Sequence, residues 1–354
     1  MHILLVWPKY YTTYPPLGLL KLSSWRKSLG DTTELVRPPQ PASRPPDLIY
    51  ITSLFSYSWK PVHKAVRCYR KLYPSARIEL GGIYASLMPE HAATSGANHV
   101  HIGLVPEAEA FLPDYDILSS VLPGWNSSLV FSSRGCIRRC PFCAVPTLEP
   151  RFTALPSIEH LVVPEHKQIV LWDNNFLASP YAENIIRELQ RLSREVDFNQ
   201  GLDARLMTPQ IAKKLRSLNI PLLRLAYDRT VYREQIRQAI AYLIEAGFKP
   251  RKIIVYVMHN FQDTPDDFYR RVRDLLEWGV VAYPMRYEPL DSLRKGQFVE
   301  RGWTAEELEM VAQARRVLGT HGAFPPYEGL VQKFIRATGF TEAFALRPRK
   351  VRAL

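Results

Sequence analysis

Three of the four cysteines in this chain lie within eight residues of one another. Cys136, Cys140 and Cys143 occur in the segment Ser-Ser-Arg-Gly-Cys-Ile-Arg-Arg-Cys-Pro-Phe-Cys, which has the spacing C-x3-C-x2-C. Thiolates are the side-chain ligands that hold iron–sulfur clusters, and three of them leave one iron of a cubane cluster open to a ligand that is not protein. The spacing therefore predicts a thiolate ligand set.

Other uses of clustered cysteines compete with this interpretation. A disulfide framework is disfavoured because three is an odd number and a chain of 354 residues can bury a core without cross-links. A structural zinc ion remains an alternative, but it needs four closed ligands, and His160 and His166 do not stand at zinc-finger spacing. Cys68 lies far from the loop in a helical pattern, where we expect it to pack as a small hydrophobic residue.

The composition is ordinary for a soluble globular protein, with 46% hydrophobic and 23% charged residues. No apolar run approaches the roughly 20 residues that span a bilayer, and the first residues lack a signal peptide's basic leader. We therefore expect a cytoplasmic protein with no membrane partner. The net charge of +12 is spread along the chain, apart from the basic stretch Leu-Arg-Pro-Arg-Lys-Val-Arg near its end. Without a nucleic-acid-binding motif, this charge alone does not indicate a nucleic-acid partner.

Residues 1–115 alternate short apolar runs with amphipathic stretches. The amphipathic stretches 17–29 and 62–73 predict helices, and the apolar runs predict buried strands. Such alternation is typical of a doubly wound parallel sheet. The predicted strands are 3–7, 35–36, 48–52, 77–80 and 99–102.

A second alternating series follows a linker at 112–128. Six strands separated by helical patterns predict an incomplete (βα)6 barrel, in which chemistry lies in the loops after the carboxyl ends of the strands. The cysteine loop comes just after the first of these strands. The predicted strands are 128–132, 168–172, 197–200, 222–226, 252–258 and 281–287, and the predicted helices are 181–194, 209–217, 231–246 and 265–277.

These patterns together predict an α/β protein in three parts. A doubly wound Rossmann-type domain occupies 1–115, and a partial TIM-like barrel occupies 127–300. A small helical extension at 301–354 ends the chain, with expected helices at 305–318 and 328–337.

The cysteine loop, with Phe142 just before its last cysteine, and the six-strand series that it opens resemble the radical SAM enzymes. The resemblance covers about half of the chain, residues 127–290. It implies that Cys136, Cys140 and Cys143 hold a [4Fe-4S] cluster and that S-adenosylmethionine (SAM) chelates the fourth iron. It also implies reductive cleavage of SAM to a 5′-deoxyadenosyl radical, with electrons from a donor such as flavodoxin or ferredoxin.

The resemblance further implies residues that contact SAM in the loops after later strands. In Leu-Trp-Asp-Asn-Asn-Phe, Asp173 and Asn174 stand where the family binds the methionine amino group, and helix capping is the alternative role. In Asn-Gln-Gly-Leu-Asp-Ala-Arg-Leu, Gln200, Asp203 and Arg205 would face the barrel mouth. Arg205 could pair with the methionine carboxylate, or it could form a structural contact with Asp203.

Two further loops show how far the resemblance extends. Asp228 follows the fourth strand, where the family places a polar residue that binds ribose, although capping the next helix is an alternative. The fifth strand lacks the family's glycine-rich adenine motif, so His259 and Asn260 are the residues that could contact adenine there.

The first domain has its own resemblance. Tyr-Pro-Pro-Leu-Gly-Leu-Leu (14–20) and Glu-Leu-Gly-Gly-Ile-Tyr-Ala-Ser-Leu-Met-Pro-Glu-His (79–91) resemble the cobalamin-binding domain fused to many radical SAM enzymes. The family's cobalt-ligating motif Asp-x-His-x-x-Gly is absent, and the loop at its place reads Thr-Ser-Leu-Phe-Ser-Tyr-Ser-Trp. His63 lies nearby in a helical pattern and is expected to be structural. This departure favours a domain without bound cobalamin, although binding without a histidine ligand stays open.

We therefore expect an enzyme that generates a 5′-deoxyadenosyl radical and acts on an unidentified substrate. Methyl transfer through cobalamin is the variant reaction if the first domain is loaded. A zinc-stabilised basic module that binds RNA without catalysis is the non-enzymatic alternative.

Overall fold

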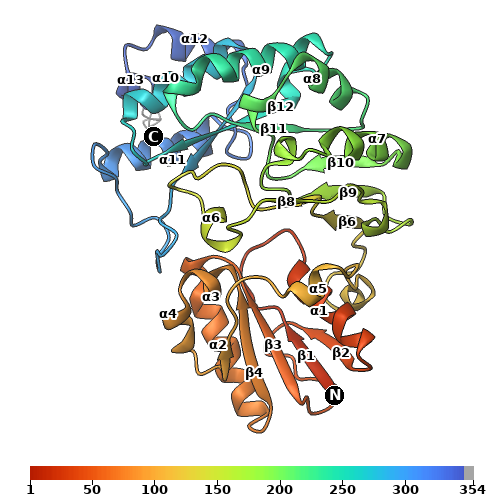
Figure 1. Ribbon diagram of the computed structural model, residues 1–354. Helices are drawn as coiled ribbons and strands as arrows, with labels where there is room; N and C mark the ends of the chain where they lie inside the picture. Colours follow the sequence, from red (N-terminus) through yellow and green to blue (C-terminus); the bar gives the residue numbers. More distant parts are fainter. Residues whose placement is uncertain (347–354) are drawn as a thin grey trace, which may run out of the picture. The chain divides into compact units, whose positions relative to one another are not determined.

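The computed structural model describes residues 1–346, and the fold is α/β with parallel sheets (Figure 1). The chain divides into two compact units, each built from two segments. The first unit contains Met1–Val170 and Glu288–Gln297, and the second contains Leu171–Tyr287 and the segment from Phe298 onwards. The three-part division into 1–115, 127–300 and 301–354 stays a prediction, and residues 347–354, with most of the basic stretch, lie outside the described residues.

A five-stranded parallel sheet organises the first unit, with the strand order β2-β1-β3-β4-β5. Each of its strands overlaps one predicted from the sequence. The strands are β1 (His2–Val6), β2 (Thr32–Val36), β3 (Leu48–Ser53), β4 (Arg77–Gly82) and β5 (His99–Val100). The helices are α1 (Leu17–Ser28), α2 (Trp59–Leu72), α3 (Ile83–Leu87), α4 (Pro89–Ala93) and α5 (Pro106–Glu109).

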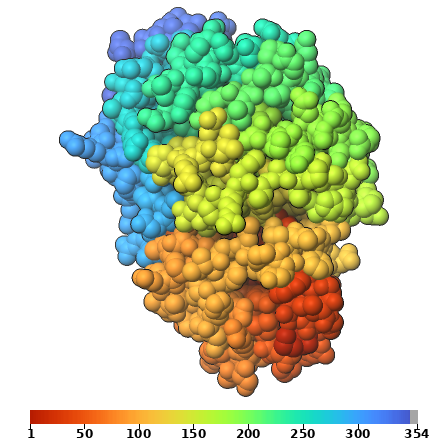
Figure 2. Space-filling view, in the orientation of Figure 1, coloured from red at the N-terminus to blue at the C-terminus, as the bar shows by residue number. Residues whose placement is uncertain are grey.

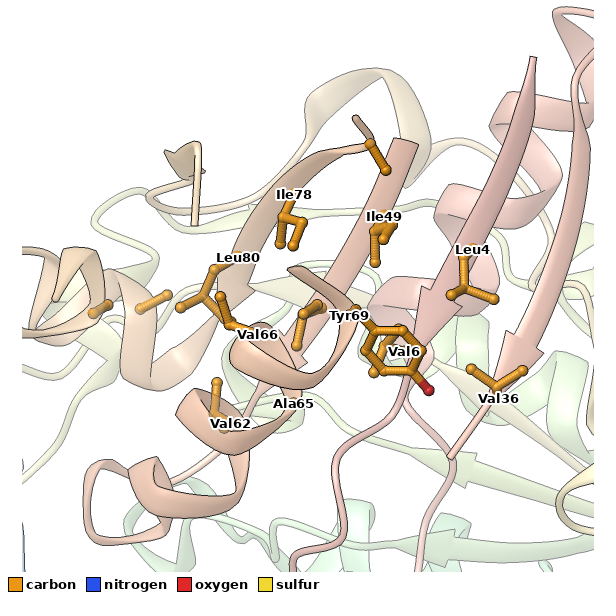
Figure 3. Close-up of a cluster of buried hydrophobic side chains, with 14 of the residues drawn as sticks. Leu4, Val6, Val36, Ile49, Val62, Ala65, Val66, Tyr69, Ile78 and Leu80 are labelled. Carbon is orange, nitrogen blue, oxygen red and sulfur yellow. The ribbon is translucent and has the colours of Figure 1, made fainter. Parts of the chain in front are cut away.

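Hydrophobic clusters cover both faces of this sheet, because alternate side chains of a strand point to opposite faces. Leu4 and Val6 of β1 belong to one cluster, whereas Ile3 and Leu5 belong to the other. Figure 3 shows the first cluster, in which the apolar face of α2, with Val66, packs over the strands. Burial on both faces explains why β1 is a continuous apolar run.

The rest of the first unit carries the cysteine loop. β6 (Ser127–Val130) lies beside β9 (Gln168–Leu171). Between them come the short strands β7 (Ser133–Arg134) and β8 (Thr153–Ala154) and the short helix α6 (Val145–Leu148).

The segment Glu288–Gln297 also belongs to the first unit, although it follows in the chain after most of the second. The indole N–H of Trp59 donates to the carbonyl of Leu293 over 3.2 Å. The ammonium of Lys295 lies 5.5 Å from the centre of the Tyr57 ring. These contacts attach the returning segment to the start of α2.

The second unit continues the strand–helix alternation. β11, β12 and β13 form a parallel sheet, and β10 precedes them in the chain. The N–H of Asn199, just after β10, donates to Leu171 over 3.0 Å, and the N–H of Leu202 donates to Arg224 of β11 over 2.8 Å. The strands are β10 (Glu195–Phe198), β11 (Leu223–Ala226), β12 (Ile253–His259) and β13 (Val281–Arg286).

Seven helices of the second unit accompany these strands within the described residues, six of them predicted. They are α7 (Ala182–Leu192), α8 (Pro209–Arg216), α9 (Arg233–Glu245), α10 (Pro265–Glu277), α11 (Ala305–Val317), α12 (Glu328–Arg336) and, unpredicted, α13 (Phe340–Phe344). A capping box of Thr264 and Asp267 fixes the start of α10. The closure of the strands into a partial barrel stays a prediction. Up to residue 346, no helix combines the length and apolar character that crossing a membrane requires.

Candidate functional site

The cysteine loop is closed at its base by a pair of short strands. β7 pairs antiparallel with β8, so that Ser133 lies opposite Ala154 and Arg134 lies opposite Thr153. The N–H of Leu155 extends the pairing with a bond of 2.8 Å to the carbonyl of Ser132. Residues 135–152, which include all three clustered cysteines, therefore leave and re-enter the fold at one fixed point.

Gly135, directly before the first cysteine of the loop, occupies a position that excludes a side chain. Its φ is +73°, and a Cβ there would lie 2.3 Å from the carbonyl oxygen of Arg151. Its N–H donates to the carboxylate of Glu149 over 2.7 Å. Only glycine combines this left-handed backbone with so close an approach of two chain segments.

An ion-pair network holds the same base. The guanidinium of Arg134 donates to Glu149 over 3.0 Å and to Glu109 over 2.5 Å, and it lies 3.5 Å from the centre of the Phe131 ring. Lys21 of α1 also bonds Glu109, over 3.1 Å. Burial raises the pKa of Glu109, but the two cations outweigh burial and hold that pKa below its usual value. The network therefore stays charged and attaches the loop to α1 and α5.

Backbone N–H groups are directed at the sulfur atoms of Cys136 and Cys143. The N–H of Arg138 lies 3.3 Å from Sγ of Cys136, and the N–H of Val145 lies 3.5 Å from Sγ of Cys143. A bond of 3.0 Å from the N–H of Cys143 to the carbonyl of Cys140 closes the turn between the last two cysteines. Hydrogen bonds to the ligand sulfur atoms are a feature of thiolate-ligated iron–sulfur sites.

The loop is accessible from outside. The three clustered cysteines are half-buried thiols, and the side chain of Ile137 between them is 51% exposed. In Figure 2 the chain around the loop, coloured yellow, reaches the molecular surface. A cluster held here would have an open side.

The donor set of the loop fits a thiolate-ligated cluster, because soft sulfur ligands with N–H donors are what such clusters require. Among residues 1–346, no three His, Cys, Asp or Glu side chains are already arranged to hold a single metal ion. His166, considered above as a zinc ligand, is buried and bonds Ser128 over 3.0 Å. Donor type, spacing and the N–H contacts are therefore what identify the candidate site.

The second unit contains the other predicted site residues, in the loops that follow strands β9 to β12. After β9, Asp173 and Asn175 are buried and Asn174 is half-buried. The side-chain amide of Asn175 donates to the carboxylate of Asp203 over 3.2 Å. The structure thus connects the loop after β9 with the loop after β10.

Asp203 and Arg205 form the contact that the sequence offered as the structural alternative. The Arg205 guanidinium binds the Asp203 carboxylate through two bonds, of 2.7 and 3.1 Å, and it lies 4.9 Å from the centre of the Tyr232 ring. Gln200 is exposed, and its amide bonds the side chain of Asn199 over 3.2 Å. The binding of SAM by these residues stays a prediction.

Asp228, after β11, has a carboxyl group with a raised pKa. Burial raises the pKa of its carboxyl from 3.8 to about 6, although Arg271 and Arg205 act in the opposite direction. The short helix that follows, Thr230–Tyr232, has Arg229 at its N-cap and no side-chain cap. Asp228 therefore does not cap that helix, which was its alternative role. Its carboxyl lies close enough to Arg205 for the guanidinium to lower its pKa.

The residues at the end of β12 serve the core. His259 is 2% exposed and packs on Phe268 and Trp303, and burial lowers its pKa to about 3. The side chain of Asn260 accepts from the N–H of Glu300 over 2.8 Å and donates to the carbonyl of Phe298 over 3.0 Å. These contacts give both residues structural roles.

Arg271 of α10 organises this part of the second unit, and our sequence analysis missed it. It is 1% exposed and donates to the carbonyls of Asp228 and Met258 over 2.7 and 2.8 Å. It also bonds the carboxylate of Asp263. Arg271 therefore links, through its hydrogen bonds, the residues just after β11, including Asp228, to the end of β12. The signal in the sequence was an arginine on the apolar face of a predicted helix.

Comparison with known proteins gives little beyond these observations. No protein-family model matches the chain, and no curated protein matches it in sequence. One solved structure that it resembles is coproporphyrinogen III oxidase (HemN) from Escherichia coli, described as a radical SAM enzyme. The match has 13% identity and a TM-score of 0.40, and it covers 62% of this chain and 60% of that one. This likeness is too slight to define fold or activity, so the function is argued from the chain's own residues.

Proposed function

We propose that this protein is a radical SAM enzyme that holds a [4Fe-4S] cluster on Cys136, Cys140 and Cys143. One observation carries the proposal. Three thiols at C-x3-C-x2-C spacing lie on an accessible loop, and its base is fixed by the β7–β8 pair and Gly135. Three ligands leave one iron for SAM, which the proposal takes as the second cofactor.

The chain's own residues would prepare this site in three ways. Arg134 and its carboxylate partners fix where the loop begins and ends. The N–H groups of Arg138 and Val145 would spread the negative charge of the thiolates. The half-buried position of the loop leaves access for SAM and for an electron donor such as flavodoxin or ferredoxin. The bound cluster would supply the electron that cleaves SAM to a 5′-deoxyadenosyl radical.

The loops of the second unit are proposed to bind SAM. Asp173 and Asn174 would accept from the methionine ammonium, and Gln200 would contribute a polar contact beside them. Asp228 would accept from the ribose hydroxyls, with Arg205 fixed near it by the bidentate pair with Asp203. The substrate on which the radical acts is not identified by these residues.

Residues 1–115 of the first unit are proposed to form a cobalamin-domain-like Rossmann domain that works without cobalamin. Its strand order matches that of doubly wound nucleotide-binding sheets of the flavodoxin type. His63 is buried, and its Nε2 lies 2.9 Å from the hydroxyl of Tyr84, as expected for a structural residue. A histidine ligand for cobalt is therefore not provided by His63.

Anaerobic reconstitution tests the cluster. The loaded protein should be brown and contain about four irons and four acid-labile sulfides. Cys140→Ala should abolish this content, whereas Cys68→Ala on α2 should retain it and so controls for loss of a thiol elsewhere. Bound zinc in place of iron, with salt-sensitive RNA binding, would instead support the zinc-stabilised RNA-binding alternative.

Reduction tests the enzymatic claim. Loaded protein with dithionite and SAM should form 5′-deoxyadenosine, and Cys140→Ala should form none. A protein that holds the cluster but never makes this nucleoside would disprove the activity while leaving the cluster site intact. Retention of added hydroxocobalamin through gel filtration would contradict the proposal that the domain at 1–115 works without cobalamin and would favour the methyl-transfer variant.

A further inference from the structure

A cationic cavity lies in the second unit, in a part of the chain that the proposed function does not use. It has a volume of about 480 Å³ and lies at the end of α11 and the turn that follows. Its lining combines three basic side chains with glycine backbone. The lining residues are Ala312, Arg315, Arg316, Gly319, His321 and Gly322.

The Arg315 guanidinium is positioned by two contacts that use few of its hydrogen-bond donors. Its guanidinium lies 5.0 Å from the centre of the Tyr283 ring on β13, and its Nε donates to the carbonyl of Gly322 over 3.2 Å. Within residues 1–346 this carbonyl is its one hydrogen-bond acceptor. A guanidinium has five N–H donors in a planar fork, so its two terminal nitrogens stay available for an oxyanion.

The turn at 320–323 gives the cavity a defined rim. Thr320 and Ala323 exchange two backbone hydrogen bonds, of 2.8 and 3.0 Å. The two residues between them, His321 and Gly322, have φ values of +51° and +84°, as in a two-residue hairpin turn of type I′. A residue other than glycine, here histidine, adopts this conformation at a cost, and such costs are concentrated at functional positions.

Glycine at 322 also makes room for the guanidinium. A Cβ at this position would lie 2.6 Å from Nη2 of Arg315. At Gly319 a Cβ would lie 2.5 Å from the carbonyl oxygen of Arg315. Both glycines therefore let the backbone of the turn approach the arginine closely.

The charge around the cavity is positive. Arg316 is exposed and pairs with Glu309 over 2.7 Å, which lowers the pKa of that carboxyl. Arg286 at the end of β13 lies close enough to lower it further. Two guanidinium groups, those of Arg316 and Arg286, thus act on this one carboxylate, and Arg315 adds a further positive charge to the cavity. The surplus positive charge favours an anion.

Helix geometry accounts for only part of this arrangement. Basic residues in the last turn of a helix are stabilised by the helix dipole, which gives Arg315 and Arg316 a structural reason to be there. The last carbonyls of α11 already have donors, since Leu318 donates to Ala314 over 2.8 Å and accepts from the Tyr327 hydroxyl over 3.1 Å. The dipole does not explain His321 in left-handed backbone at the rim, nor the volume left between these groups.

We propose that this cavity is a binding site for a small anion, a phosphate or carboxylate group, held by Arg315, Arg316 and His321. The terminal nitrogens of Arg315 would form the floor of the site, and Arg316 and His321 would close it from the rim. The site is independent of the cysteine loop, so its test does not require a cluster.

The test is isothermal titration of the full-length protein with inorganic phosphate, and separately with malonate, at constant ionic strength set with sodium chloride. Saturable binding of phosphate alone identifies a phosphate group as the ligand, and saturable binding of malonate alone identifies a carboxylate. Arg316→Gln and His321→Asn should each weaken binding about 10- to 100-fold, since a charge-assisted hydrogen bond contributes about 1.5–3 kcal/mol. Asparagine tolerates positive φ, so the turn should survive the second change.

A matched control exists on α9. Arg237 is exposed and pairs with Glu234 over 2.8 Å, much as Arg316 pairs with Glu309. Arg237→Gln should leave anion binding unchanged while removing the same charge. Circular dichroism checks that each variant is folded. The proposal is overturned if neither anion binds saturably, or if Arg316→Gln and Arg237→Gln weaken binding equally.

Discussion

Replacing Gly135 by alanine should destabilise the first unit more than a glycine replacement usually does. The left-handed backbone at φ +73° costs an alanine about 1–2 kcal/mol. The added Cβ would also stand 2.3 Å from the carbonyl oxygen and 2.8 Å from the carbonyl carbon of Arg151. Overpacking of this kind costs about 1–3 kcal/mol more, because the backbone of one segment must move. The expected total loss in the free energy of unfolding is about 2–5 kcal/mol.

Gly30 provides the matched control in the same unit. Its φ is +85°, close to that of Gly135, but a Cβ there would meet no atom within 4 Å. Gly30→Ala should therefore show the conformational cost alone, about 1–2 kcal/mol. Urea denaturation of the wild type and both variants, followed by circular dichroism, gives the comparison. Equal losses for the two variants would refute the claim that the chain packs tightly on Gly135.

Three further predictions concern the buried polar groups. Arg271→Gln should lower the free energy of unfolding by about 3–5 kcal/mol, because it leaves the buried Asp263 carboxylate without its cation and removes bonds to two carbonyls, whereas Arg270→Gln, at an exposed neighbour, should change it little. Denaturation at a fixed pH measures both, and equal effects would contradict the role given to Arg271. The Asp228 carboxyl keeps its proton longer in the folded state, so its stabilising contribution is fully present below pH 3.8 and is lost as pH rises to about 6. Asp228→Asn should flatten this part of the stability–pH curve, and an unchanged curve would show that the carboxyl is not buried. His63 titrates in the opposite sense: burial, with His91 and Arg67 adding to it, lowers its pKa from 6.5 to about 4, so acid should destabilise the fold over that interval. NMR titration of the imidazole measures its pKa directly, and a value near 6.5 would exclude the burial seen here.

The regular elements could be predicted because each shows its pattern within a short window of sequence. β12, with the run Ile-Ile-Val-Tyr-Val-Met-His, and α10, with a capping residue and a proline at its start, agree closely with the prediction. The short elements β7, β8 and α6 were missed, because two to four residues carry no measurable periodicity. Those three elements are what hold the cysteine loop.

The residues of the candidate site also differ in whether the sequence alone could identify them. The cysteine spacing and the polar residues after the strands are local signals, so they could be found from the sequence. The partners of Arg134 could not be predicted, since Glu109 and Glu149 lie 25 and 15 residues away and nothing in the sequence pairs them. The raised pKa of Asp228 likewise depends on the burial that Arg271 and the folded chain create. Long-range pairing is the part of the chemistry that only the three-dimensional structure reveals.

The contact between Trp59 and Leu293 sets an order in which the protein can be completed. These two residues are separated by 234 positions, and the larger segment of the second unit, Leu171–Tyr287, is encoded between them. As the polypeptide emerges from the ribosome, the first unit can form its sheet early, but the indole of Trp59 must wait for its acceptor until the ribosome has passed position 293. No single cleavage can release both units whole. A gene shortened to begin at position 171 still encodes all of the second unit, whereas no shortening from one end yields the first unit whole and alone.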